Sequence, residues 1–149
     1  MIEVRVCKGA LPQENLRARE TGVSAGAVVS FCGVVRNLNH NRAVIALDYD
    51  CAPSLAEACL RQIAEEAAAR WGAEQVVVHH GYGPIGIGQA SVFLLVATPK
   101  REAAFEACRY LIEEIKTRVP VWKREVYADG ESVWLEGTPL PEASSGSPR

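Results

Sequence analysis

The stretch KREAAFEACRYLIEEIKTRVPVWKREV, residues 100–126, is the most informative part of the sequence for the fold, because its pattern changes from helical to extended at Pro120. Residues 101–119 have the apolar spacing of a helix that packs one face on a core. The apolar arc of this helix consists of Phe105, Cys108, Leu111, Ile112 and Ile115. Proline cannot continue a helix, and residues 121–127 alternate as a strand does.

The same kinds of pattern predict further elements on both sides of this stretch. Strands are expected over 2–7, 26–35, 43–50, 76–80, 90–98 and 132–136, and helices over 12–21 and 53–71. Strand 43–50 is expected to form a hairpin with the buried strand 26–35, across a turn or mobile loop at 36–42. The glycine-rich run 81–88 is expected to be a turn, and Leu55, Cys59, Ile63 and Ala67 a core stripe. These elements predict an α+β domain, with a mostly antiparallel sheet and two long helices packed on it.

Length and composition predict one globular domain. The 149 residues are 48% hydrophobic and 23% charged, and no apolar run is long enough to cross a bilayer. We expect a single domain over 1–136 and a flexible Pro/Ser/Gly-rich tail over 137–149. Five cysteines without CxxC spacing, and a start without a signal-peptide pattern, favour a reduced, cytoplasmic protein with no metal site.

Two lysines near Pro120 are the first candidates for chemistry. Lys116 falls at the edge of the apolar helix arc, and Lys123 shares a strand face with Glu125. If the two ammonium groups converge on one pocket, they depress each other's pKa and attract an anion. The alternatives are a lysine whose stem covers the edge of the core and ordinary surface charges on a half-exposed strand.

Other cations could join an anion site. Arg36 follows a buried strand, where a guanidinium can hold a phosphate through two hydrogen bonds. Lys100 and Arg101 lie at a helix N-terminus, which also favours anions. His79 and His80 are consecutive strand residues on opposite faces, so they do not form a metal site together.

Three stretches resemble the MoaE family, the large, catalytic subunits of molybdopterin synthase. They are GAVVSFCGVVRNLN at 26–39, KREAAFEACRYLIEEIK at 100–116 and VPVWKREVYADGESVW at 119–134. The resemblance implies an α/β hammerhead-type fold and a homodimer within a heterotetramer. The partner it implies is a small ubiquitin-like sulfur-carrier subunit of the MoaD type, with a C-terminal Gly-Gly thiocarboxylate. The implied reaction in molybdenum cofactor biosynthesis transfers sulfur to cyclic pyranopterin monophosphate and forms the molybdopterin dithiolene, without a cofactor.

The resemblance also assigns roles to residues. Lys116 and Lys123 match the family's essential lysines, and Arg101 matches an arginine that reaches the pocket from the other subunit. The full set of implied substrate-binding residues is Val34, Val35, Arg36, Lys100, Arg101, Lys116, Lys123, Arg124 and Glu125. Lys100 departs from the histidine usual at its position, which puts a proton-transfer role there in doubt.

A binding module is the competing class of function. The net charge is −2, but residues 100–125 carry seven basic against five acidic residues. This basic segment could bind nucleic acid, with Trp122 and Tyr127 as stacking platforms. An excess of two charges, flanked by acidic segments, is weak support for that class. A third possibility is a relative that keeps the fold and the partner but has lost turnover, against which the retained lysines argue.

Overall fold

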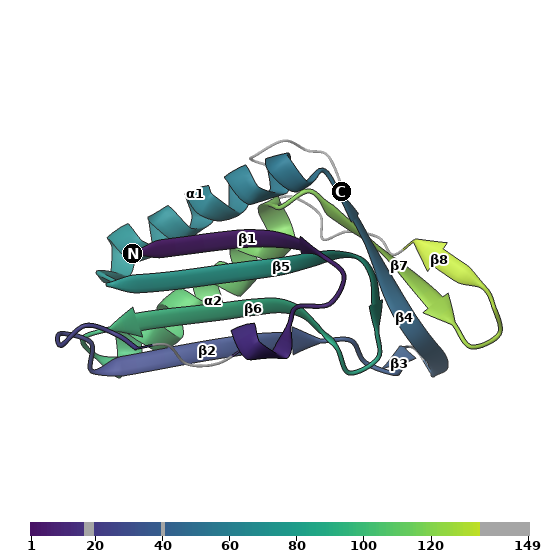
Figure 1. The fold of residues 1–149 in the computed structure, drawn as a ribbon, viewed down its shortest axis with the longest axis horizontal. Helices are drawn as coiled ribbons and strands as arrows, with labels where there is room; N and C mark the ends of the chain where they lie inside the picture. The colour runs from purple at the N-terminus through teal and green to yellow at the C-terminus, as the bar shows by residue number, and fades with distance from the viewer. Residues whose placement is uncertain (17–19, 40, 135–149) are drawn as a thin grey trace.

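The computed structural model describes residues 1–16, 20–39 and 41–134, and within them eight strands, two α-helices and one 3₁₀ turn (Figure 1). The strands are β1 (Ile2–Lys8), β2 (Ala27–Val34), β3 (Leu38–Asn39), β4 (Arg42–Cys51), β5 (Gln75–Gly86), β6 (Ala90–Thr98), β7 (Val121–Tyr127) and β8 (Ser132–Trp134). The helices are α1 (Pro53–Trp71) and α2 (Arg101–Arg118), and the 3₁₀ turn is η1 (Gln13–Asn15). The prediction of a mostly antiparallel sheet with two long helices is confirmed.

The strands form one sheet in the order β2-β6-β5-β4-β7-β8, with β1 paired to β5 and β3 paired to β4. Of these pairings, only β1 with β5 is parallel. The first half of β5 pairs with β1 and β6, and its last residues, 83–86, pair with β4. Strands β4, β7 and β8 run at a steep angle to the other strands (Figure 1). Strand β5 therefore joins the two parts of the sheet.

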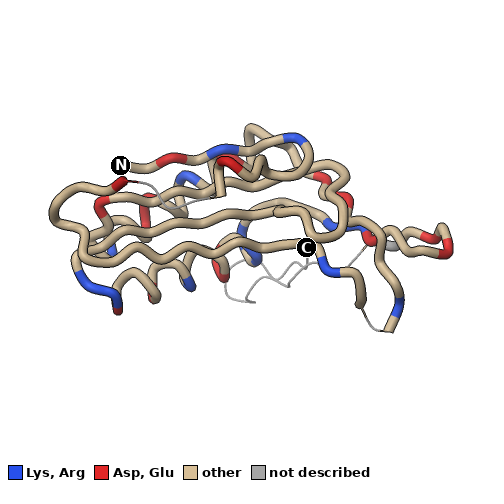
Figure 2. The backbone as a smooth tube through the Cα atoms, turned by 60° about the horizontal axis from the view of Figure 1, so that its bottom comes forward, with Lys and Arg blue, Asp and Glu red and all other residues tan. Residues whose placement is uncertain are grey.

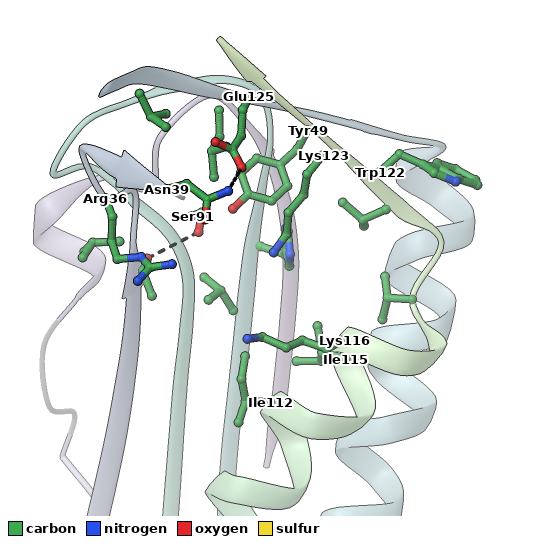
Figure 3. A pocket seen from close by; sticks show the side chains of 18 of the residues that line it. Arg36, Asn39, Tyr49, Ser91, Ile112, Ile115, Lys116, Trp122, Lys123 and Glu125 are labelled. Carbon is green, nitrogen blue, oxygen red and sulfur yellow. Dashed lines mark hydrogen bonds between the residues drawn. The ribbon is translucent and has the colours of Figure 1, made fainter. Parts of the chain in front are cut away.

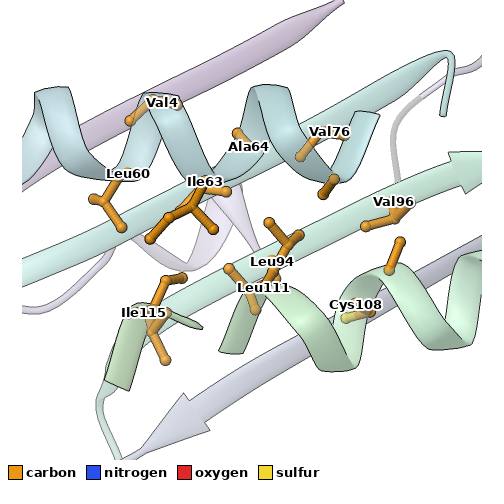
Figure 4. Close-up of a cluster of buried hydrophobic side chains, with 14 of the residues drawn as sticks. Val4, Leu60, Ile63, Ala64, Val76, Leu94, Val96, Cys108, Leu111 and Ile115 are labelled. Carbon is orange, nitrogen blue, oxygen red and sulfur yellow. The ribbon is translucent and has the colours of Figure 1, made fainter. Parts of the chain in front are cut away.

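The core lies between the two helices and the sheet (Figure 4). Ile63 on α1, Leu111 on α2 and Leu94 on β6 are completely buried there. Helix α1 is terminated by Gly72, which has a left-handed φ of 61°. Glycine adopts this conformation without strain because it has no side chain. The predicted stripe on α1 was partly wrong, because Leu55 is exposed and Cys59 only partly buried. The helix faces the core with Ala56, Leu60, Ile63, Ala64 and Ala67, a stripe rotated by about one residue.

The predicted hairpin between β2 and β4 is wrong. Strand β2 pairs with β6, and β4 pairs with β5 and β7. The chain between them forms the two-residue strand β3, which pairs with the start of β4. Strand β2 is also less buried than expected: Phe31 is 39% and Val34 53% exposed. Its position at the end of the strand order explains this exposure, since one edge has no neighbouring strand in the described chain.

The glycine-rich run is mostly strand rather than turn, because β5 continues to Gly86. A side chain at Gly81 would come within 2.6 Å of the carbonyl oxygen of Gly9, so glycine allows β5 and the end of β1 to lie close together.

The predicted helix at 12–21 is a single 3₁₀ turn in the part that is described. The prediction for the tail, 137–149, lies outside the described residues. None of the helices described could span a membrane.

Candidate active site

A cavity of about 510 Å³ opens where the end of β2, strands β4, β5 and β7, and the C-terminal part of α2 meet. Figure 3 shows Arg36, Lys116 and Lys123 reaching into it from three different segments. Arg36 lies between β2 and β3, Lys116 on the last turn of α2, and Lys123 on β7. The prediction that the two lysines converge on one pocket is thus confirmed.

The two lysines differ in their surroundings. Lys116 is exposed at the mouth of the cavity, whereas Lys123 is half-buried and lies over the ring of Tyr49, 5.9 Å from its centre. Burial lowers the pKa of Lys123, and the charges of Lys116 and Arg36 lower it further, while Glu125 opposes them. Lys123 therefore gives up its proton more readily than an ordinary surface lysine.

Glu125 places a carboxylate in the cavity wall. Its side chain is only 2% exposed and accepts a hydrogen bond from the side-chain amide of Asn39. It lines the same cavity as Lys123, as their shared strand face predicts. The hydrogen bond from Asn39 ties the short strand β3, and with it the segment of Arg36, to β7.

Sequence reasoning missed Asn39, Tyr49, His80 and Ser91, which also line the cavity. His80 is buried, and its ring meets that of Tyr49 edge-on at 5.7 Å. Burial lowers the pKa of His80, and the charge of Lys123 lowers it further, against the raising effect of a hydrogen bond to Gly81. Strand alternation separates His80 from His79, which is bonded to Glu3 instead. Strand alternation in the sequence indicates that His79 and His80 lie on opposite faces of the sheet. It does not indicate which of these faces borders the cavity, so His80 could not be assigned to the site.

Several predicted site residues lie elsewhere. Arg124 points to the other face of β7 and pairs with Asp48 at 2.6 Å, and Val35 is buried in a small core cluster beside the cavity. Lys100 and Arg101 are at the N-terminal end of α2, about 22 Å of helix away from Lys116. Val34, Arg36, Lys116, Lys123 and Glu125 are the predicted residues that the cavity brings together.

Metal chemistry finds no support in the described residues. No group of three or more His, Cys, Asp or Glu side chains lies close enough there to hold an ion. The arrangement is that of an anion site, with three basic side chains, one buried carboxyl group and an imidazole of lowered pKa around one opening.

Residues 9–118 match the family model described as MoaE protein. The chain is 41% identical over 124 residues to the molybdopterin synthase catalytic subunit of Halalkalibacterium halodurans, covering 80% of this chain and 79% of that protein. It is 36% identical over 118 residues to the Arabidopsis thaliana protein of the same name. That match covers 79% of this chain and 59% of the longer plant protein.

Solved structures show the same fold. The molybdopterin synthase structure from Staphylococcus aureus aligns with a TM-score of 0.80 and 32% identity, over 88% of this chain and 95% of that one. A chain from a Helicobacter pylori complex of subunits 1 and 2 of molybdopterin-converting factor aligns with a TM-score of 0.74, over 97% and 99%. At 20% identity, this second likeness concerns the fold alone.

Proposed function

The chain belongs to the MoaE family, and on that premise we propose that it is the catalytic subunit of a molybdopterin synthase. Its substrate would be cyclic pyranopterin monophosphate, and its sulfur donor the C-terminal thiocarboxylate of a small ubiquitin-like subunit. The observation that carries the proposal is the convergence of Arg36, Lys116 and Lys123 on one cavity. Both proposed reactants are anions, which such a cluster binds.

The positions of the three cations suggest a different role for each in binding the substrate and the partner's tail. Arg36, with its planar guanidinium, suits the cyclic phosphate, and half-buried Lys123 would hold the substrate from the opposite wall. Lys116, which is exposed at the opening, would meet the tail of an incoming partner. Each sulfur delivery forms a carbon–sulfur bond on the pterin while a carbon–oxygen bond at the same carbon breaks, and that oxygen leaves as water or as phosphate. Water then attacks the acyl carbon and breaks its bond to sulfur, which leaves the sulfur on the pterin and a carboxylate on the partner.

Preorganised charge is the catalytic contribution that we assign to the lysines. Negative charge develops on the acyl oxygen and on the departing sulfur, and ammonium groups already in place stabilise it without reorganisation. The lowered pKa of Lys123 also suits it to return a proton within the cavity. Lys116 would act as proton shuttle or as transient acceptor of the acyl end.

A second copy of the chain would complete the site. Arg101 is too far from the cavity to act within one chain, because most of α2 separates it from Lys116. The open edge of β2, which exposes Phe31 and Val34 beside the cavity, offers a surface for such a copy. We therefore propose a homodimer, in which Lys100 and Arg101 of one protomer serve the cavity of the other, and a heterotetramer with two small subunits.

The test is reconstitution of dithiolene formation from the full chain, a thiocarboxylated small subunit and the pyranopterin precursor, followed by mass spectrometry. Lys116→Ala and Lys123→Ala should each reduce the rate by about a hundredfold, as expected for loss of one preorganised charge. Lys8→Ala, at an exposed lysine of β1 away from the cavity, is the matched control. A near-normal rate for Lys116→Ala would refute its role.

The structure weakens the nucleic-acid alternative. Tyr127 is buried, and Arg42 already covers its ring at 3.6 Å, so it is not free to stack on a base. Basic and acidic positions are interspersed along the described chain (Figure 2). Of the two aromatic residues expected to stack on bases, only Trp122 is exposed, and it lines the same cavity as Lys116 and Lys123.

A further inference from the structure

His80 differs chemically from the other groups around the cavity. It lies on β5, next to the junction of the two parts of the sheet, and is 8% exposed. The neighbouring His79 faces the opposite side, where it meets Glu3 and Phe93. The imidazole of His80 therefore faces the cavity, whereas that of His79 does not.

One hydrogen bond determines which ring nitrogen carries the proton. Nδ1 of His80 lies 2.7 Å from the carbonyl oxygen of Gly81. A carbonyl oxygen only accepts, so Nδ1 is the donor and carries the hydrogen. Burial and the charge of Lys123 lower the pKa of the ring, which favours its neutral form. In that form Nε2 has a lone pair and can accept a hydrogen bond.

His80 offers a ligand an acceptor that cannot also donate. Arg36, Lys116 and Lys123 carry only donors, and Oε1 of Glu125 is engaged by Asn39 while its Oε2 is buried. The hydroxyls of Tyr49 and Ser91 also line the cavity, but a hydroxyl can donate as well as accept, whereas Nε2 of the neutral ring only accepts. The edge-on contact with Tyr49 holds the ring in place. The cavity thus combines a cluster of cations with a neutral, fixed acceptor.

We propose that Nε2 of His80 accepts a hydrogen bond from a ring N–H of the substrate, while the cations hold its anionic group. His80 is then a specificity-determining residue, which selects an anionic nitrogen heterocycle over a simple anion. The inference rests on the proposed function, since it names the part of the pyranopterin that His80 recognises. It assigns no role to His80 in binding inorganic phosphate, which the cations alone suffice to hold.

Binding of cyclic pyranopterin monophosphate to the full chain, measured by titration calorimetry, tests the inference. His80→Phe keeps a ring against Tyr49 but removes the acceptor, so the substrate should bind about tenfold more weakly. His80→Gln can place its amide oxygen near the position of Nε2 and should bind within about threefold of the original chain. Inorganic phosphate should bind all three proteins equally. Equal binding of the pyranopterin to the original chain and His80→Phe would overturn the inference and leave the proposed function standing.

A second measurement needs no substitution and so does not depend on how the variants fold. In protein labelled with ¹⁵N-histidine, the Nε2 resonance of His80 should move on addition of the pyranopterin, in the direction expected for a nitrogen that accepts a hydrogen bond. Inorganic phosphate should move it much less. A resonance that stays in place while calorimetry records binding would refute the contact. Failure of the original chain to bind the pyranopterin at all would instead overturn the proposed function, and the inference with it.

Discussion

Glu66→Gln should destabilise the protein in a pH-dependent way, because Glu66 links the two helices that support the cavity. Its carboxylate, on α1, accepts hydrogen bonds from Arg118 at 2.6 and 2.9 Å and from the hydroxyl of Tyr110 at 2.7 Å. Arg118 and Tyr110 are both on α2, and Arg118 is two residues beyond Lys116. The substitution removes the charge but keeps the size of the side chain.

The magnitude follows from the pKa of Glu66. Arg118 is the main cause that lowers this pKa from 4.5 to about 2, against a smaller raising effect of burial. At about 1.36 kcal/mol per pH unit, the full shift corresponds to about 3 kcal/mol. The side chains of Glu66 and Arg118 keep 35% and 27% of their exposure, so solvent screens the pair. We expect a loss of about 1–1.5 kcal/mol at pH 7.

The sign of the pH dependence follows from the lowered pKa. A carboxyl whose pKa is lower in the folded than in the unfolded protein stabilises the fold above pH 4.5, and this stabilisation is lost as the pH falls towards 2. The difference between the original chain and Glu66→Gln should therefore shrink by about two fifths or more between pH 6 and pH 3.5.

Urea unfolding of both proteins across this pH range, followed by circular dichroism, measures the difference. Glu65→Gln, at the exposed neighbour on α1, is the matched control and should change stability by less than about 0.5 kcal/mol. A difference for Glu66→Gln that is the same at pH 6 and pH 3.5 would show that the charge of Glu66 does not matter. The reasoning would then be wrong, even if the variant were less stable.

Two further predictions concern the site and the core. NMR of the side-chain nitrogen of Lys123 should give a pKa below the ordinary value of 10.5. Lys116→Met should raise the titration midpoint of Lys123, because the charge of Lys116 is one of the causes that lower its pKa. An unchanged midpoint would mean that the two amines do not interact. Leu111→Ala should cost about 2–5 kcal/mol in urea unfolding, since Leu111 is fully buried between α2 and the sheet; a cost under 1 kcal/mol would contradict the packing described for it.

Local patterns predicted the elements near Pro120 well. The structure places α2 at Arg101–Arg118 and β7 at Val121–Tyr127, within one residue of expectation. Both depend on signals within a few residues, such as helical spacing and a proline that ends the helix. The partner of β2 depends instead on contacts between distant segments, and the nearest strand in the sequence was the wrong choice.

The site shows the same division. The pattern around Pro120 indicated that Lys116 and Lys123 could meet, since a helix end and a strand face fix their directions. Arg36 lies 80 residues before Lys116 in the sequence, and Asn39 lies 86 residues before Glu125, so no local pattern indicates that these residues meet. Phe105 illustrates the limit of periodicity alone: it was placed on the apolar arc but is 62% exposed, while Ala104 and Ala107 face the core.

The length of β5 has a consequence for the order in which parts of the cavity open. Residues 76–80 of this strand are bonded on both sides, to β1 and to β6, so their amide protons should be among the slowest to exchange with solvent. Arg36 instead precedes a strand of two residues, which should exchange early. The part of β5 that carries His80 would then stay folded while the segment of Arg36 fluctuates. A ligand would therefore enter the cavity past the mobile segment of Arg36 and bind against the rigid strand β5.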